Sequence, residues 1–188
     1  MKRFLAPLVI GAATLVLLAG CGGGANHNDQ DVSFATDMVP HHQQAVEMAD
    51  LAAARASDAT VKALAARIKA AQDPEIRTMQ GWLSDWDKAS DMGGMDHGGG
   101  SSMAGGSDGM GMMSDADMGA LKAASGTAFD RMFLTSMISH HTGAIEMAKT
   151  EQAKGKHQPA KDLAKTIQDT QAQEIAEMQQ ILAGLPAS

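Results

Sequence analysis

Cysteine and aromatic residues are scarce in this chain of 188 residues, and their scarcity limits its chemistry. There is one cysteine, Cys21, there is no tyrosine, and 3% of the residues are aromatic. A single cysteine cannot form a disulfide within the chain and offers no cluster of thiolates for a metal. A metal site must therefore be built from histidine, methionine and carboxylate side chains.

Basic residues are also fewer than acidic ones. The chain has 15 Lys and Arg against 22 Asp and Glu, a net charge of −7, and it has no run of basic residues. Nucleic-acid-binding proteins need a basic patch or stripe, so we expect no nucleic acid partner. The sequence also has no Gly-x-Ser-x-Gly motif and no phosphate-binding loop at Gly155-Lys156, so the hydrolase and nucleotide-binding classes with those motifs are not indicated.

The N-terminus has the pattern of an export signal. Lys2 and Arg3 precede an apolar stretch, residues 4–20, that is too short to span a bilayer. It ends in Leu-Ala-Gly-Cys and resembles a bacterial lipoprotein signal. We expect cleavage after residue 20, lipidation of Cys21, and a tether at 21–30 that holds the protein on the extracytoplasmic face of a bacterial membrane in the cell envelope. An ordinary secretory signal or an uncleaved anchor is the alternative.

An internal repeat dominates the rest of the chain. Residues 31–83 and 130–182 align without a gap, and 21 of the 53 positions are identical. Each copy has a core of the form Met-x-x-His-His-x-x-Ala-x-Glu-Met-Ala, written MVPHHQQAVEMA in the first and MISHHTGAIEMA in the second. A repeat of this kind shows how a fold is assembled, and here it duplicates histidine and methionine together.

Within each copy the apolar residues recur every three or four positions, which predicts two helices per copy. One helical hairpin cannot bury its apolar face, but two can, so we predict an all-α, ferritin-like four-helix bundle over residues 31–184. The hairpins are expected at 31–88 and 127–184, with a disordered Met- and Gly-rich connection at 89–118. Pro40 and Pro74 fall inside predicted helices and are expected to kink them.

The paired histidines and their methionines are the candidate metal ligands. Adjacent helical residues point about 100° apart, so we expect one histidine of each pair to face inward and the other to face the bundle edge. Imidazole and thioether without thiolate suit copper, and sulfur favours Cu(I); histidines that serve only a polar core are the alternative. The candidates are His41, His42, His140, His141, Met38, Met48, Met137 and Met147.

Two glutamates lie on the apolar stripe of the second and fourth predicted helices. Glu75 and Glu174 are costly there unless they meet a cation or a histidine. We expect each to accept a hydrogen bond from a metal-binding imidazole and so to fix its tautomer; direct binding of the metal by the carboxylate is the alternative. Neither is followed by histidine three residues later, so the Glu-x-x-His signal of a di-iron oxidase is absent.

The connection between the hairpins carries its own potential ligands. Thioethers on a flexible segment can wrap a Cu(I) ion, whereas a neutral spacer or a target of oxidation is the alternative. The residues proposed for metal capture are Met92, Met95, His97, Met103, Met110, Met112 and Met113.

The repeated His-His motif, followed by a second helix with Gln-x-x-Glu-Ile-x-x-Met, resembles the family known as domain of unknown function 305. The resemblance covers residues 31–184 and both halves. It implies a ferritin-like helical fold in a secreted or lipid-anchored protein, and some similar proteins are periplasmic copper binders. The motif positions that carry over are the eight His and Met candidates named above, and Pro40 departs from the pattern in the first copy.

Together these patterns predict a lipid-anchored protein of the cell envelope that binds copper for buffering, sequestration or handover. A structural or protein-interaction bundle without metal is the alternative, and a metal-dependent redox enzyme is a further one. The sequence indicates no catalytic residue and no particular protein partner.

Overall fold

The computed structural model describes residues 26–93 and 110–186, and every regular element in these ranges is helical. The signal sequence and Cys21 lie outside the described residues, as do Met95, His97 and Met103. The helices are α1 (Asp29–Arg55), α2 (Ala59–Gly93), α3 (Asp115–Ala123), α4 (Gly126–Lys154) and α5 (Gln158–Gly184).

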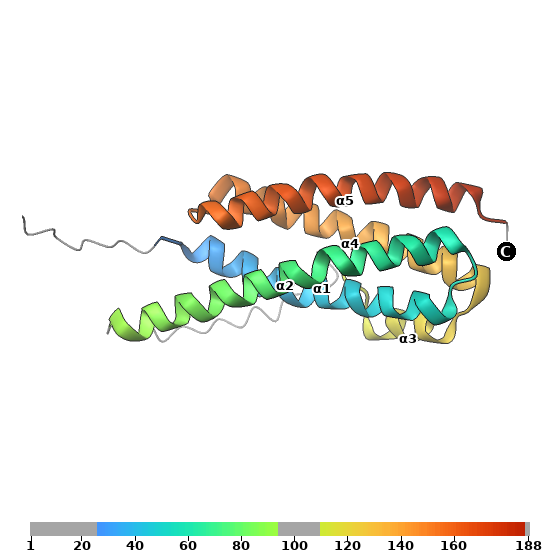
Figure 1. The fold of residues 1–188 in the computed structure, drawn as a ribbon, viewed down its shortest axis with the longest axis horizontal. Helices are drawn as coiled ribbons and strands as arrows, with labels where there is room; N and C mark the ends of the chain where they lie inside the picture. Colours follow the sequence, from blue (N-terminus) through green and yellow to red (C-terminus); the bar gives the residue numbers. More distant parts are fainter. Residues whose placement is uncertain (1–25, 94–109, 187–188) are drawn as a thin grey trace, which may run out of the picture.

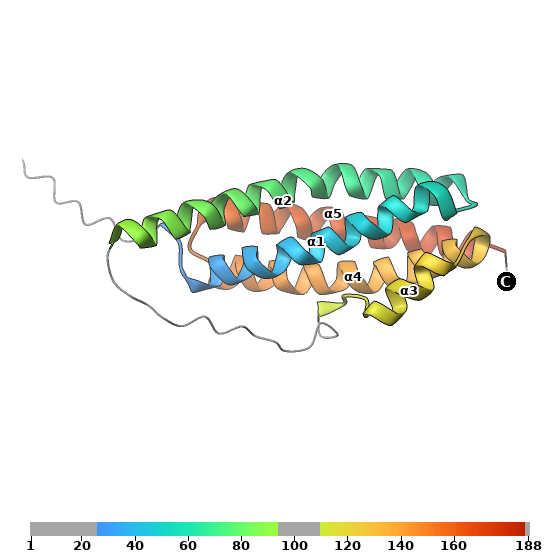
Figure 2. The same ribbon diagram turned by 90° about the horizontal axis from the view of Figure 1, so that it is seen from below.

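The four long helices form two antiparallel hairpins, α1 with α2 and α4 with α5 (Figure 1). The hairpins meet chiefly through α1 and α4, while α2 and α5 have few contacts with each other (Figure 2). The predicted all-α bundle of two repeated hairpins is confirmed. None of the helices in the described ranges has an apolar stretch of the length that a bilayer crossing needs.

Both internal prolines are accommodated without a break. Pro40 lies inside α1 and Pro74 inside α2, and each helix continues on both sides of its proline. Each ring removes one backbone donor, yet packing of the amphipathic faces holds both helices together.

The short helix α3 is an element that the sequence did not reveal. Ser114 caps it, with Oγ accepting a hydrogen bond from the backbone N–H of Asp117 at 3.1 Å, and Met118 and Leu121 are buried. Its apolar residues are mostly alanine and follow a Gly/Met tract, so in sequence this segment resembles part of the connection. The connection expected at 89–118 is therefore shorter, because α2 extends to Gly93 and α3 begins at Asp115.

The core consists of two apolar clusters with a polar layer between them. One cluster holds Met48, Leu64, Phe133 and Met178, and the other holds Phe34, Met38, Met79 and Ile167 among their members. In each long helix, buried polar residues fall between positions that belong to the two clusters. These layer residues are His41, His42, Gln72, His140, His141 and Gln171.

Each hairpin also provides a carboxylate that binds the turn of the other hairpin. Asp130 is fully buried and its carboxylate accepts backbone N–H bonds from residues 57–58, at 3.0 to 3.3 Å. Its repeat equivalent, Asp31, accepts backbone N–H bonds from residues 156–157, at 2.9 to 3.2 Å. These two reciprocal contacts repeat the same chemistry across the approximate two-fold axis, and they satisfy turn donors that would otherwise lack partners.

Candidate metal centre

The four repeated histidines gather in one buried layer. All four have 0% exposure. His41 of α1 and His140 of α4 stack across the hairpin interface, with ring centroids 3.7 Å apart and planes tilted by 37°. Within each pair the centroids are 6.4 Å apart. The layer thus has the two-fold symmetry of the repeat.

The expectation that one histidine of each pair faces the bundle edge differs from the structure. The two side chains do diverge, but each long inner helix has a neighbour in both directions. His41 faces His140 on α4, whereas His42 turns toward Glu75 on α2. Because α1 is flanked by two helices at this level, both directions lie inside the bundle.

Two of the imidazoles are held by carboxylates. His42 Nε2–H donates to Glu75 Oε2 at 2.8 Å, and His141 Nε2–H donates to Glu174 Oε2 at 2.7 Å. In a neutral imidazole this leaves the Nδ1 lone pair free. Metal-binding histidines commonly have such a carboxylate partner on the nitrogen away from the metal, and the glutamates lie where that role requires.

The other two imidazoles are held differently. His41 Nε2–H donates to the carbonyl of Met110 at 2.9 Å, while neither ring nitrogen of His140 has a hydrogen-bond partner. Burial lowers the pKa of His41 to about 4 and lowers the pKa of His140 well below its ordinary value. Both rings are therefore neutral at pH 7 and keep a lone pair for a ligand.

The layer contains an unusual number of buried polar atoms without partners. They are Nδ1 of all four histidines, Nε2 of His140, both amide atoms of Gln72, and Oε1 of Gln171. Each such atom costs about 1–3 kcal/mol when nothing replaces water. A cation that accepts imidazole lone pairs would remove much of this cost, so the donor set fits a metal.

The arrangement favours a soft ion of low coordination number. Among the described residues, no three side chains of His, Cys, Asp or Glu lie close enough together to hold a metal ion between them. Structural zinc sites use four such ligands, and calcium uses six or more oxygens. Neutral imidazoles with thioethers nearby suit Cu(I) better.

The four helical methionines frame this layer from both sides. Met38 and Met137 are fully buried one turn before the histidines and belong to opposite apolar clusters. Met48 is also fully buried, in the cluster around Phe133. Its repeat equivalent, Met147, is only half-buried and lines a surface cavity. Equivalent sequence positions thus differ in access to solvent.

Residues 110–113, which we term the strap, lie beside the histidines and contact both α1 and α4. Gln44 holds the strap through two bonds to the backbone of Met113, at 2.7 and 2.9 Å. At the equivalent position α4 has Gly143, where an added Cβ would lie 1.7 Å from the Met110 carbonyl oxygen. Gly111 has a φ of +72°, and a Cβ there would lie 2.2 Å from the Ser139 carbonyl oxygen.

Sequence reasoning did not find Gln44 and Gly143, which let the strap reach His41. The sequence did contain a clue to them. The two aligned motifs have Gln at position 44 and Gly at position 143, although the histidines and the alanine around these positions are identical. Asp31 and Asp130 were also missed, although they are identical residues at the first position of each repeat.

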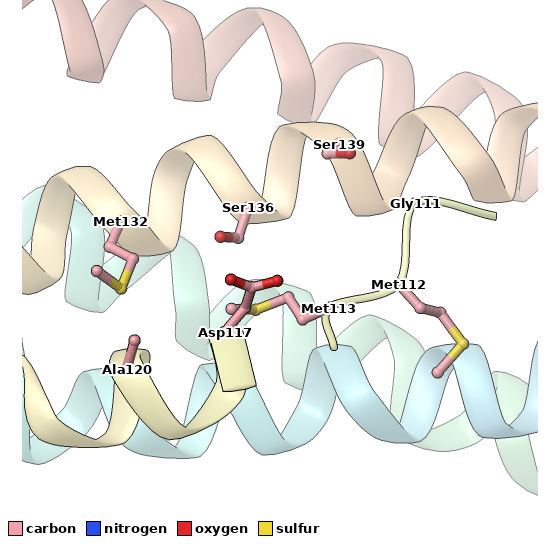
Figure 3. Close-up of a pocket in the computed structure, with 8 residues that line it drawn as sticks. All are labelled: Gly111, Met112, Met113, Asp117, Ala120, Met132, Ser136 and Ser139. Carbon is pink, nitrogen blue, oxygen red and sulfur yellow. The ribbon is translucent and has the colours of Figure 1, made fainter. Parts of the chain in front are cut away.

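A second cavity, of about 220 Å³, lies on the other side of the strap between α3 and α4. Figure 3 shows the carboxylate of Asp117 facing Ser136, with the side chain of Met113 running toward Asp117. The side chain of Met112 points away from this group (Figure 3). The strap methionines proposed for capture therefore face different surroundings, and the side chain of Met92 lies outside what the structure describes.

Comparison with known proteins gives one family and several solved structures. The family model described as domain of unknown function (DUF305) matches residues 31–182. A DUF305 protein from Streptomyces coelicolor is 32% identical with a TM-score of 0.69, covering 82% of this chain and 92% of its own. A DUF305 fragment from Deinococcus radiodurans is 30% identical with a TM-score of 0.70, covering 84% and 98%.

The protein CopM is a further similar structure. Its Cu(II)-bound form is 34% identical with a TM-score of 0.65, covering 81% of this chain and 95% of its own. Its Cu(I)-bound form is 31% identical with a TM-score of 0.62, covering 80% and 93%. No curated protein matches the chain.

Proposed function

Because the chain belongs to the family described as domain of unknown function (DUF305), we propose that it binds copper, chiefly as Cu(I), in the buried histidine layer. The carrying observation is the set of four fully buried imidazoles whose Nδ1 atoms all lack a partner. Two of these imidazoles are oriented by glutamates and a third by the Met110 carbonyl. The solved structures of the relative CopM with Cu(I) and with Cu(II) support this choice of metal.

We further propose that copper is cargo rather than a catalytic cofactor. The layer is closed to solvent on every histidine, so a substrate would have no direct access to a bound ion. Sequestration, buffering or handover requires only that the ion enter and leave. The N-terminal signal supports placing this activity in the cell envelope, on a lipid attached to Cys21. The methionines of the connection, such as Met95 and Met103, would capture the ion there together with His97.

The imidazoles would supply the first ligands, and Met38 or Met137 the adjacent thioethers. Glu75 and Glu174 would hold the rings of His42 and His141 in the orientation that presents Nδ1. Removing such supporting carboxylates typically costs 10–100-fold in metal affinity, so a Glu75→Gln variant should bind copper more weakly by about that factor.

The decisive experiment is an anaerobic Cu(I) titration against a chromophoric chelator. Cys21 is alkylated first, so that its thiol does not bind the ion. Compared with the wild type, His41→Leu/His140→Leu should lose the tightest bound equivalent. His27→Ala is the matched control, because His27 stacks on Trp86 outside the layer and its loss should leave the titration unchanged.

The alternatives give different outcomes in the same titration. Unchanged tight binding in the double variant would move the site to the connection methionines and overturn the proposal for the layer. Absence of tight binding in the wild type would leave a structural or interaction bundle whose histidines serve a polar core. Circular dichroism of each variant checks that the helices remain intact.

A further inference from the structure

A cavity of about 250 Å³ beside the strap brings together two methionines that are 37 residues apart in sequence. Met110 reaches it from the strap and Met147 from α4. The rest of its lining comes from α1 and α4: Gln30, Ser33, Phe34, Asp37 and Thr150. The cavity is open to solvent, unlike the histidine layer, so an ion can reach it directly.

Both methionines of this cavity also place it next to the histidine layer. The backbone carbonyl of Met110 accepts the hydrogen bond of His41 Nε2, so the same residue contributes to both places. Met147 is seven residues after His140 on α4, which places it on the same helix face about 10 Å along the axis. The cavity therefore lies next to His41 and His140, on the side that the strap covers.

The repeat itself shows that this position is specialised. Met48, the equivalent of Met147, is fully buried in an apolar cluster and cannot meet an ion from solvent. The strap passes directly over Gly143, four residues before Met147, and no second strap exists in the described ranges. The strap thus adds a second methionine beside Met147 in a cavity open to solvent, whereas Met48 is closed to solvent.

The chemistry of the lining selects the class of ligand. Two thioethers are soft, neutral donors that favour monovalent copper or silver. A single carboxylate, Asp37, provides negative charge at the rim but too few oxygens for calcium or magnesium. No histidine lines the cavity, so it differs in donor type from the buried layer.

We propose that Met110 and Met147 form a separate, solvent-accessible thioether site for a soft monovalent cation, Cu(I) or Ag(I). Its role as the point from which the ion passes to the buried histidines rests on the proposed function. The site itself does not, because its donors are different residues. Transfer is a ligand exchange from thioether to imidazole, with no change in the oxidation state of the ion.

Silver titration followed by NMR of methyl-13C-methionine tests the site on the full chain with Cys21 alkylated. Ag(I) stands in for Cu(I) without redox chemistry. The methyl signals of Met110 and Met147, assigned with Met110→Leu and Met147→Leu, should both shift upon addition of Ag(I). They should also shift in the His41→Leu/His140→Leu background, where the buried imidazole pair is missing. Met147→Leu should abolish the shift at Met110.

Met132→Leu is the matched control, because Met132 is also a half-buried methionine of α4 but does not line this cavity. Its loss should leave the shifts of Met110 and Met147 unchanged. The proposal is overturned if the two methyls do not respond to Ag(I), or if they respond only when the histidines are present. It is also overturned if Met147→Leu leaves the Met110 shift intact.

The two proposals fail separately in this design. Loss of copper binding by the layer, with intact Met110 and Met147 shifts, contradicts the proposed function and leaves the thioether site standing. Unshifted methyls with a normal chelator competition contradict the thioether site and leave the layer standing.

Discussion

His41 and His140, which are equivalent residues of the two repeats, lie against each other across the α1–α4 interface, with ring centroids 3.7 Å apart and ring planes tilted by 37°. Contact between the same residue of two copies places the approximate two-fold axis at these rings. The metal proposed for the layer would therefore lie near the axis, where the two halves contribute equally. The strap breaks this equivalence, because it gives His41 a hydrogen-bond partner and leaves His140 with none.

Replacing His140 by leucine should stabilise the copper-free protein. Both ring nitrogens of His140 are buried without partners, and removing such atoms recovers about 1–2 kcal/mol of the free energy of unfolding. Urea denaturation of the copper-free protein measures the change. A loss of stability larger than about 1 kcal/mol would show that the imidazole holds the core together without metal.

Adding a methyl group at Gly143 should displace the strap. A Cβ there would lie 1.7 Å from the Met110 carbonyl oxygen, so the strap must move and His41 must lose its partner. We expect Gly143→Ala to lower stability by about 1–3 kcal/mol, although alanine favours a helix by about 1 kcal/mol over glycine. Thermal unfolding provides the measurement.

Gly119→Ala is the control for that substitution. Gly119 lies inside α3 and nothing approaches within 4 Å of an added Cβ. It should gain up to about 1 kcal/mol from helix propensity alone. Equal effects of the two substitutions would mean that the strap does not depend on Gly143.

Asp130→Ala should be among the more damaging single changes at the interface between the two hairpins. The carboxylate satisfies the backbone N–H groups of Ser57 and Asp58 and the hydroxyl of Ser57, so its removal should cost about 2–4 kcal/mol. Asp169→Ala, which breaks only an exposed pair with Lys165, should change stability by less than about 0.5 kcal/mol. Chemical denaturation of both variants tests the difference.

Stability should fall as pH rises from about 5 to about 8. Burial, with the neighbouring Asp31, raises the pKa of Glu151 from 4.5 to about 8. A carboxyl whose pKa is raised in the folded state binds its proton more tightly there, so its contribution is complete below pH 4.5 and is lost as pH rises through about 8. Melting temperatures at several pH values should show this slope, and Glu151→Gln should remove it.

The fold could be predicted from the sequence because the internal repeat and the helical period both indicate a bundle of two helical hairpins. Two hairpins with matched apolar faces leave few other ways to bury them. The gathering of His41 with His140 also follows from symmetry, since equivalent residues near an axis must approach each other. The pairing of Glu75 and Glu174 with histidines was inferred from the cost of placing a carboxylate on an apolar stripe.

Other parts of the site depend on contacts that no periodicity encodes. The burial of His42 and His141 required knowing that each inner helix has neighbours on two sides. The strap depends on a backbone carbonyl, on Gln44, and on the missing side chain of Gly143. The contacts of His41 and Gln44 with the strap join residues 69 positions apart, and neither contact has an equivalent in the other repeat that could reveal it.

The reciprocal contacts of Asp31 and Asp130 make the two halves of the protein dependent on each other. Each repeat contains the bend of its own hairpin but not the carboxylate that completes it. A single repeat expressed alone would leave that bend uncapped, so we expect it to be unstable as a monomer. Two separate copies of one repeat could complete each other's bends, so we expect a single repeat to fold only as a symmetric dimer.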